Sequence, residues 1–246
     1  MKVSLFVTCI VDQTAPHVGA AVVEVLRRLG VGVAFNPRQT CCGQPAFNTG
    51  YRREAAEVAA AMLDLFEEEL ASADYVVAPS GSCAAMVRKY YAELFASDPG
   101  RRARAERVGA RFFEFSQFLV EVLGVEDVGA VFDGRVTYHD SCHLLRDLGV
   151  ADAPRALIRN VRGAELVELE GSDACCGFGG TFSVKYPEIS AAVAGEKADR
   201  VERSGADALV ACDSGCLMQT AGVLSRRGAA VRCLHLAELL AGRGGR

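Results

Sequence analysis

A Cys-Cys-Gly tripeptide occurs twice in this chain, and it constrains the fold more than any other feature. The first copy stands in residues 40–45 (TCCGQP) and the second in residues 174–180 (ACCGFGG). An isolated cysteine is most often a small core residue, but core packing gives no reason to repeat an adjacent pair followed by glycine. We therefore interpret each copy as part of a metal–sulfur site.

The repeat extends well beyond the tripeptide. Other cysteines recur at nearly the same offset: Cys142 follows Cys9 by 133 residues, Cys175 follows Cys41 by 134, and Cys216 follows Cys83 by 133. The segment ADYVVA at 73–78 likewise corresponds to ADALVA at 206–211. These offsets indicate an internal duplication, with one half at about residues 1–130 and the other at 131–246.

Each half alternates short apolar runs with helical periodicity, which predicts an α/β fold with parallel sheets covered by helices. The predicted strands are 3–9, 31–35, 75–78, 112–115, 136–142, 165–169, 208–211 and 231–234. The main predicted helices are 15–29, 51–70, 117–123, 144–161 (interrupted by Gly149 and Pro154), 187–204 and 237–240. Residues 97–110 are expected to form a charged connection, and the polar tail 242–246 is expected to be frayed. Because ligands bind at the carboxyl ends of parallel strands, the cysteine-bearing loops are expected to meet there.

Four cysteines in each half occupy matching positions. They are Cys9, Cys41, Cys42 and Cys83 in the first half, and Cys142, Cys175, Cys176 and Cys216 in the second. Four thiols are the usual complement of a [4Fe–4S] cluster or of a closed zinc site. Cys212 falls opposite Pro79 and is an optional fifth ligand of the second half. Cys233 lies in the last predicted strand of its half (231–234), as Phe112 does in strand 112–115, and this match favours a packing role.

The adjacent cysteines favour an iron–sulfur cluster over zinc. Structural zinc sites commonly use Cys-x-x-Cys loops, whereas neighbouring side chains on an extended segment point to opposite faces. Two such thiols reach a cluster of several metal atoms more easily than one small ion. Gly43 and Gly177 are expected to let the backbone approach the cluster and donate N–H groups to sulfur. Zinc, a disulfide between the repeated cysteines, and plain burial of the thiols stay open as alternatives.

Composition excludes several other classes of protein. The formal net charge of −4 argues against a nucleic-acid partner. We find no signal peptide, and no apolar stretch approaches the roughly 20 residues that a transmembrane helix needs. Half of the 246 residues are hydrophobic, so the chain does not need disulfides to stabilise a core. Ten cysteines in such a chain are typical of a cytoplasmic protein that binds metal or performs redox chemistry.

Two histidines flank Cys142 and have no counterpart in the first half. His139 and His143 fall opposite Phe6 and Ile10. Our hypothesis is that one of them hydrogen-bonds a cluster sulfur, carries a proton during electron transfer, or contacts a substrate carboxylate; a structural role is the alternative. The chain has no Gly-x-Gly-x-x-Gly and no phosphate loop, so we expect no bound nicotinamide, flavin or ATP. A protein that moves electrons without an organic cofactor must obtain them from a partner.

The whole chain resembles the cysteine-rich domain family with tandem Cys-Cys-Gly motifs. The segments that carry the resemblance include 40–48 (TCCGQPAFN), 79–83 (PSGSC), 139–143 (HDSCH), 175–182 (CCGFGGTF) and 213–218 (DSGCLM). That family includes the B subunit of heterodisulfide reductase, the C subunit of anaerobic glycerol-3-phosphate dehydrogenase and the iron–sulfur subunit of glycolate oxidase. The motifs are most similar to those of its lactate-utilisation branch.

The resemblance implies an iron–sulfur subunit of a three-part cytoplasmic complex that oxidises L-lactate to pyruvate. It also implies two [4Fe–4S] clusters and partner subunits that include a ferredoxin-like iron–sulfur protein. In the heterodisulfide reductase relative, five cysteines hold a non-cubane cluster that attacks a disulfide. This chain departs from that pattern, because Pro79 replaces one cysteine and the second half has Cys212-x-x-x-Cys216. A disulfide reductase with such a cluster in the second half and a non-enzymatic zinc module remain the alternatives.

Overall fold

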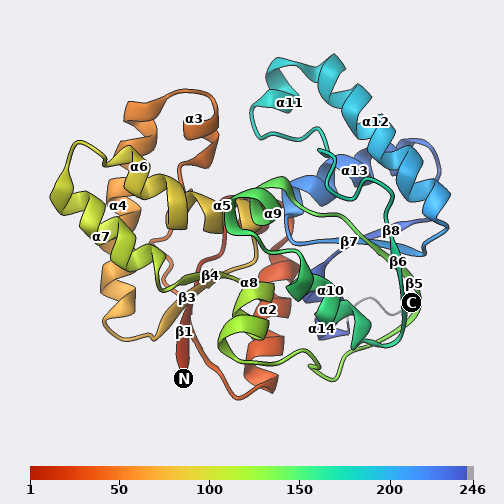
Figure 1. Ribbon diagram of the computed structural model, residues 1–246, viewed down its shortest axis with the longest axis horizontal. Coiled ribbons are helices and arrows are strands. Elements are labelled where there is room, and N and C mark those ends of the chain that lie inside the picture. The colour runs from red at the N-terminus through yellow and green to blue at the C-terminus, as the bar shows by residue number, and fades with distance from the viewer. Residues whose placement is uncertain (243–246) are drawn as a thin grey trace.

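Each half of the chain forms its own four-stranded sheet in the computed structural model, which describes residues 1–242 (Figure 1). The strands are β1 Lys2–Leu5, β2 Gly32–Ala34, β3 Tyr75–Ala78, β4 Phe112–Glu114, β5 Val131–Tyr138, β6 Arg162–Glu168, β7 Ala208–Ala211 and β8 Arg232–His235. Their order is β2-β1-β3-β4 in one sheet and β6-β5-β7-β8 in the other, and all neighbours pair in parallel. The predicted α/β fold with two tandem halves is therefore confirmed.

Helices join the parallel strands in both halves. The first half contains α1 Cys9–Thr14, α2 Pro16–Arg28, α3 Gln44–Asn48, α4 Arg52–Leu70, α5 Gly81–Ala85, α6 Tyr91–Leu94, α7 Pro99–Gly109 and α8 Phe115–Gln117, with π-helical segments at Met86–Tyr90 and Phe118–Val122. The second contains α9 Cys142–Leu148, α10 Asp152–Arg159, α11 Phe182–Lys185, α12 Pro187–Ser204, α13 Ser214–Arg226 and α14 Leu236–Ala241. None of the helices within residues 1–242 has the length and apolar character needed to cross a membrane.

Two details differ from the sequence-based expectation, and a third is not tested. The charged connection expected at 97–110 is in fact helix α7. Pro99 is its first residue, and Asp98 caps it by accepting a hydrogen bond from the N–H of Arg101. The strands expected to end at Cys9 and Cys142 stop earlier, and both cysteines begin short helices instead. The expected frayed tail after residue 242 lies outside the described residues.

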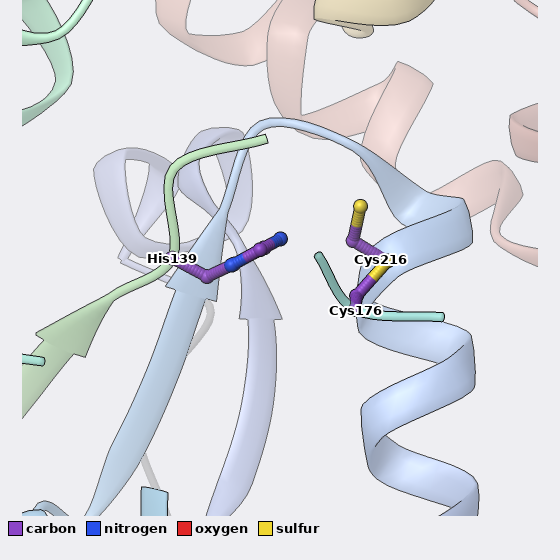
Figure 2. Close-up of side chains that lie close together, drawn as sticks. All are labelled: His139, Cys176 and Cys216. Atoms are coloured by element: carbon purple, nitrogen blue, oxygen red, sulfur yellow. The ribbon is translucent and has the colours of Figure 1, made fainter. Parts of the chain in front are cut away.

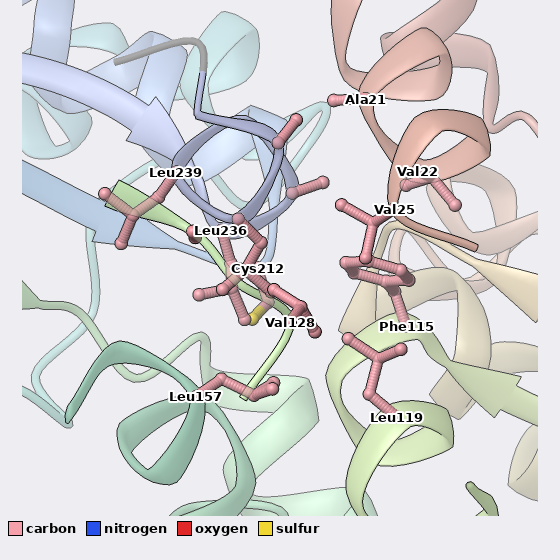
Figure 3. Packing of buried hydrophobic residues seen from close by; sticks show 14 of the residues in the cluster. Ala21, Val22, Val25, Phe115, Leu119, Val128, Leu157, Cys212, Leu236 and Leu239 are labelled. Atoms are coloured by element: carbon pink, nitrogen blue, oxygen red, sulfur yellow. The ribbon is translucent and has the colours of Figure 1, made fainter. Parts of the chain in front are cut away.

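One face of each sheet packs against a core that the two halves share. Helix α2 of the first half lies against α14 of the second, and Val22, Val25, Leu236 and Leu239 are completely buried there (Figure 3). Burying one such side chain stabilises the fold by about 1.5–3 kcal/mol. The shared core therefore fixes how the two sheets face each other, while the division of the chain near residue 130 stays a prediction.

The outer face of each sheet is covered by its own helices. Helices α4 to α7 pack on the first sheet, and α12 and α13 pack on the second. A direct contact joins the halves beside the cysteines, where α5 meets α9. A Cβ atom at Gly81 would lie only 2.4 Å from the Cβ of Leu144, so this approach requires glycine. The carboxyl ends of both sheets are thereby held next to each other.

Candidate metal centre

The two sets of four cysteines line a single cavity of about 160 Å³ between the halves of the molecule. One water molecule needs only about 10–15 Å³ on the same measure, so the cavity has room for a group of several atoms. Its lining contains all eight repeated cysteines: Cys9, Cys41, Cys42, Cys83, Cys142, Cys175, Cys176 and Cys216. The structure thus brings the predicted ligands of both halves to one place.

The Cys-Cys-Gly turns have the same local geometry in both halves. The N–H of Gly43 lies 3.4 Å from the sulfur of Cys41, and the N–H of Gly177 lies 3.3 Å from the sulfur of Cys175. Both glycines have a left-handed backbone conformation, with φ of 86° and 84°. Glycine adopts this conformation without steric cost. Each turn therefore directs one backbone donor at the first sulfur of its pair.

The remaining cysteines stand at or near the first residues of helices. Cys9 and Cys142 open α1 and α9, and Cys83 and Cys216 each lie in the first turn of α5 and α13. Backbone N–H groups without partners in a first helical turn favour thiolate over thiol. The sulfurs of Cys42 and Cys83 lie 3.4 Å apart, although they are 41 residues apart in sequence.

Asp213 ties the two cysteine edges together. Its carboxylate, at the start of α13, accepts hydrogen bonds from the side chains of Ser80 and Ser82 at 2.7 and 2.8 Å. It also accepts one from the backbone N–H of Ser82 at 3.2 Å. Sequence reasoning missed this residue, although the offset places Asp213 opposite Ser80 and so marks a difference between the halves. The helices that carry Cys83 and Cys216 therefore share one buried carboxylate.

Crowding of the thiols disfavours their simultaneous ionisation. Hydrogen bonds with Cys41 and Cys83, together with complete burial, raise the pKa of Cys42. Burial raises the pKa of Cys142, and the hydrogen bond with Cys176 followed by burial raises that of Cys175. Several buried thiolates need a compensating cation, and a bound metal supplies one. The donor set, the volume and the backbone donors fit a metal–sulfur group.

The two candidate histidines have different environments. His139 is 2% exposed and follows β5, and its Nδ1 lies 3.0 Å from the carbonyl oxygen of Ser172. Burial, with a contribution from Lys197, lowers the pKa of His139 to about 4. His143 lines the cavity, and its Nδ1 lies 2.7 Å from the carboxylate of Asp147. Asp147 also accepts hydrogen bonds from Tyr90 and Lys89 of the first half, which hold it in place.

The two other cysteines lie away from the cavity lining. Cys212 is completely buried in the shared apolar core, and its nearest polar contact is the hydroxyl of Tyr138 at 3.4 Å (Figure 3). The structure therefore does not bring this optional fifth ligand to the other thiols. Cys233 lies in β8 and packs against the apolar cluster under α12 and α13, as its position opposite Phe112 suggested.

Lys197 is a further buried charge that sequence reasoning missed. Its ammonium group on α12 donates to the carbonyl oxygens of Gly171 and Ser172 at 2.7 and 3.2 Å, and the side chain is 1% exposed. Burial and the nearby Arg200 lower its pKa to about 8, against the opposing effect of Cys176 and Cys216. The sequence does place this lysine within the apolar stripe of an amphipathic helix, and that position could have identified it as buried.

Comparison with known proteins agrees with this architecture. The family model described as "Cysteine-rich domain", CCG, matches residues 3–88 and 136–220. Lactate utilization protein A of Geobacillus kaustophilus is 52% identical over 240 residues, covering 98% of each chain. The protein of the same name from Geobacillus thermodenitrificans is 50% identical, with the same coverage.

Likeness to solved structures is much weaker. A putative Asp/Glu racemase from Yersinia pestis has a TM-score of 0.41 and 10% identity, covering 99% of this chain and 97% of that one. This likeness is too low to bear on fold or function. The matched family model and the relatives carry the assignment, and the clustered thiols indicate a metal site. The chain belongs to the cysteine-rich domain family and carries two copies of its Cys-Cys-Gly domain.

Proposed function

We propose that this protein is the iron–sulfur electron-transfer subunit of a system that oxidises L-lactate to pyruvate. The observation that carries the proposal is the convergence of eight repeated cysteines on one cavity, in a chain about half identical to proteins named for lactate utilization. Two sets of four thiols match the requirement of two [4Fe–4S] clusters. The proposal places the protein in the cytoplasm, with partner subunits that include a ferredoxin-like iron–sulfur protein.

In this proposal each half holds one cluster through its own four thiols. Cys9, Cys41, Cys42 and Cys83 are the ligands in the first half, and Cys142, Cys175, Cys176 and Cys216 are those in the second. Bound clusters supply one-electron redox chemistry. Gly43 and Gly177 donate N–H groups to ligand sulfurs, which makes the reduced, more negative state easier to reach.

The protein's own residues also prepare the site for electron transfer. Asp213 keeps the starts of α5 and α13 together, so the two sets of thiols stay close. His143 is held by Asp147 at the cavity wall and can accept or release a proton there. The buried core behind the cysteines keeps water away from them on that side. Short separation and limited water access both favour electron transfer between the two sites.

Metal analysis of protein purified without oxygen tests the proposal. We expect about four iron and four sulfide per cluster, hence about eight of each per chain, with a broad absorption near 400 nm. Oxidation of L-lactate with the partner subunits present should bleach this absorption. Stoichiometric zinc without sulfide would overturn the proposal and leave the zinc module.

Disulfide reduction at a five-thiol cluster is the less favoured candidate. Its supporting feature was Cys212 as the extra thiol of the second half. That thiol is completely buried in the apolar core and is absent from the cavity lining. No cysteine within residues 1–242 offers a replacement, because Cys233 also packs away from the cavity.

A further inference from the structure

A buried histidine, His139, lies beside the thiols of the second half and has no equivalent in the first half. His139 follows β5 in the second half, and the duplication places Phe6 at the corresponding position in the first. Phe6 is completely buried and packs edge-on against the rings of Phe66 and Phe112, with centroids 5.2 and 6.0 Å away. The first half therefore offers only sulfur, whereas the second half has an imidazole beside its thiols.

The hydrogen bond to Nδ1 settles which nitrogen of His139 carries the proton. Nδ1 faces the carbonyl oxygen of Ser172 at 3.0 Å, and a carbonyl oxygen can only accept. Nδ1 must therefore donate, and the neutral ring then has a free lone pair on Nε2. The ammonium of Lys197 donates to the same carbonyl at 3.2 Å and adds a positive charge beside the ring.

That lone pair points at two predicted metal ligands. A ring nitrogen of His139 and the sulfurs of Cys176 and Cys216 lie within 4.8 Å of one another, and Figure 2 shows the outer nitrogen facing the two cysteines. Nε2 is buried and has no hydrogen-bond partner among the described residues. An unsatisfied buried polar atom costs about 1–3 kcal/mol, so the position calls for a partner.

A cation between these three atoms satisfies all of them. Once Cys176 and Cys216 are thiolates, neither has a proton to donate, and the lone pair of Nε2 would face two negative charges. A single metal ion, or neighbouring irons of one cluster, can accept all three donors. Histidines that bind metals commonly donate their other N–H to a backbone carbonyl, and the carbonyl of Ser172 occupies that place here.

We propose that His139 is a metal ligand through Nε2 in the second half, next to Cys176 and Cys216. The metal is an iron atom of the second-half cluster, and to that extent the inference rests on the proposed function. Each iron of a [4Fe–4S] cluster takes one ligand from the protein, so His139 replaces one of the four thiolates assigned to that half. The two halves then hold unlike centres, one ligated by sulfur alone and one with a nitrogen ligand. A neutral nitrogen ligand carries less negative charge than a thiolate, which raises the reduction potential.

Pulsed EPR of the reduced protein tests the ligand directly. Protein labelled with ¹⁵N-histidine should show a strong nitrogen coupling on one of its two cluster signals. His139→Phe, which copies the first half, should lose that coupling while circular dichroism shows an intact fold. His139→Cys should keep the iron and lose the coupling, and its second-half potential should become more negative. His143→Phe is the matched control and should retain the coupling.

The outcomes separate this inference from the proposed function. A full complement of iron and sulfide, with a nitrogen coupling that is absent or survives in His139→Phe, would overturn the inference alone. Absence of iron and sulfide would overturn the proposed function, and His139 would then be tested with Co²⁺ added to the metal-free protein. An absorption spectrum and affinity for Co²⁺ that differ between the wild type and His139→Phe would support ligation by His139. Identical spectra and affinities would overturn it.

Discussion

Two buried positions next to the first set of cysteines hold apolar side chains, and the corresponding positions next to the second set hold polar ones. Helices α4 and α12 follow Tyr51 and Tyr186, and eleven residues further on they place Met62 and Lys197 at corresponding buried positions. Each of these two side chains is 1% exposed. Phe6 and His139, described above, show the same difference: the residue of the first half is apolar and that of the second half is polar. The two halves thus share the same thiols but differ in the buried residues next to them.

This difference affects charge more than shape. The sulfur of Met62 accepts a hydrogen bond from the N–H of Thr40 at 3.4 Å, so the first half adds no charge at this point. Lys197 adds a buried positive charge to the second half, near Cys176 and Cys216. Buried charges are poorly screened by solvent. Two sites with the same ligand spacing therefore acquire different electrostatic surroundings. Under the proposed function, this difference gives electron transfer between the two clusters a preferred direction.

Removal of one ligand from each half should have the largest effect. Cys83→Ala and Cys216→Ala delete equivalent thiols, and each should abolish the cluster of its own half, with about half of the iron and sulfide lost. Iron and sulfide analysis with EPR of the reduced protein measures this. Cys212→Ala is the control and should keep all the iron, because Cys212 faces the apolar core. Loss of all iron in either variant would show that the halves do not load independently.

The two glycines of the Cys-Cys-Gly turns should differ in their tolerance of a side chain. A Cβ at Gly177 would lie 2.6 Å from the carbonyl oxygen of Ser190, whereas a Cβ at Gly43 would lie 3.3 Å from that of Ala55. Gly43→Ala should cost about 1–2 kcal/mol for its left-handed backbone. Gly177→Ala must also move backbone and should cost about 3 kcal/mol or more.

Urea unfolding of the metal-free proteins measures both free energies. Gly222→Ala is the matched control, since it lies in α13 with a negative φ and open space around it. That change should stabilise the helix by up to about 1 kcal/mol. Equal losses for Gly43→Ala and Gly177→Ala would mean that α12 adjusts more easily than its packing indicates.

Much of this arrangement could be predicted from the sequence because the duplication acts as an internal alignment. It identified the eight cavity cysteines, and strand periodicity identified the parallel α/β architecture. The direction of Cys212 could not be predicted, because a residue at a strand end points into the core or toward the site according to register. Sequence also could not show that both sets face one cavity, since this depends on the packing of α2 against α14.

The residues that end the fourth strand of each half should give opposite pH dependences of stability. Glu114 caps α8 by accepting from the N–H groups of Ser116 and Gln117, and burial raises its pKa to about 7. His235 caps α14 through a hydrogen bond from Ala237, and burial lowers its pKa to about 4. Native Glu114 holds its proton above the unfolded pKa of 4.5, so its stabilising contribution is lost as the pH rises through 7. His235 is stabilising above its unfolded pKa of 6.5, and that contribution is lost as the pH falls through 4.

Unfolding free energies of the metal-free protein across this pH range test both signs. Glu114→Gln should remove the loss of stability that accompanies a rise in pH from 4.5 to about 7. His235→Gln should remove the loss that accompanies a fall in pH from 6.5 to about 4. Each change in slope should amount to roughly 3 kcal/mol at most over its window. Curves for the two variants that run parallel to that of the wild type would contradict the assignment of these groups.

Replacement of Lys197 should have the smallest effect and should act on the second half alone. Lys197→Met copies Met62 of the first half and removes the buried positive charge that favours the reduced, more negative state. The second-half potential should become more negative by about 60 mV, which is a tenfold change in equilibrium constant for one electron. Potentiometric titration followed by EPR measures both halves in one sample. Lys185→Met is the control, because Lys185 is exposed and its charge is screened. Equal shifts in both halves would mean that the charge acts across the whole cavity, and the asymmetry would then have to come from His139 alone.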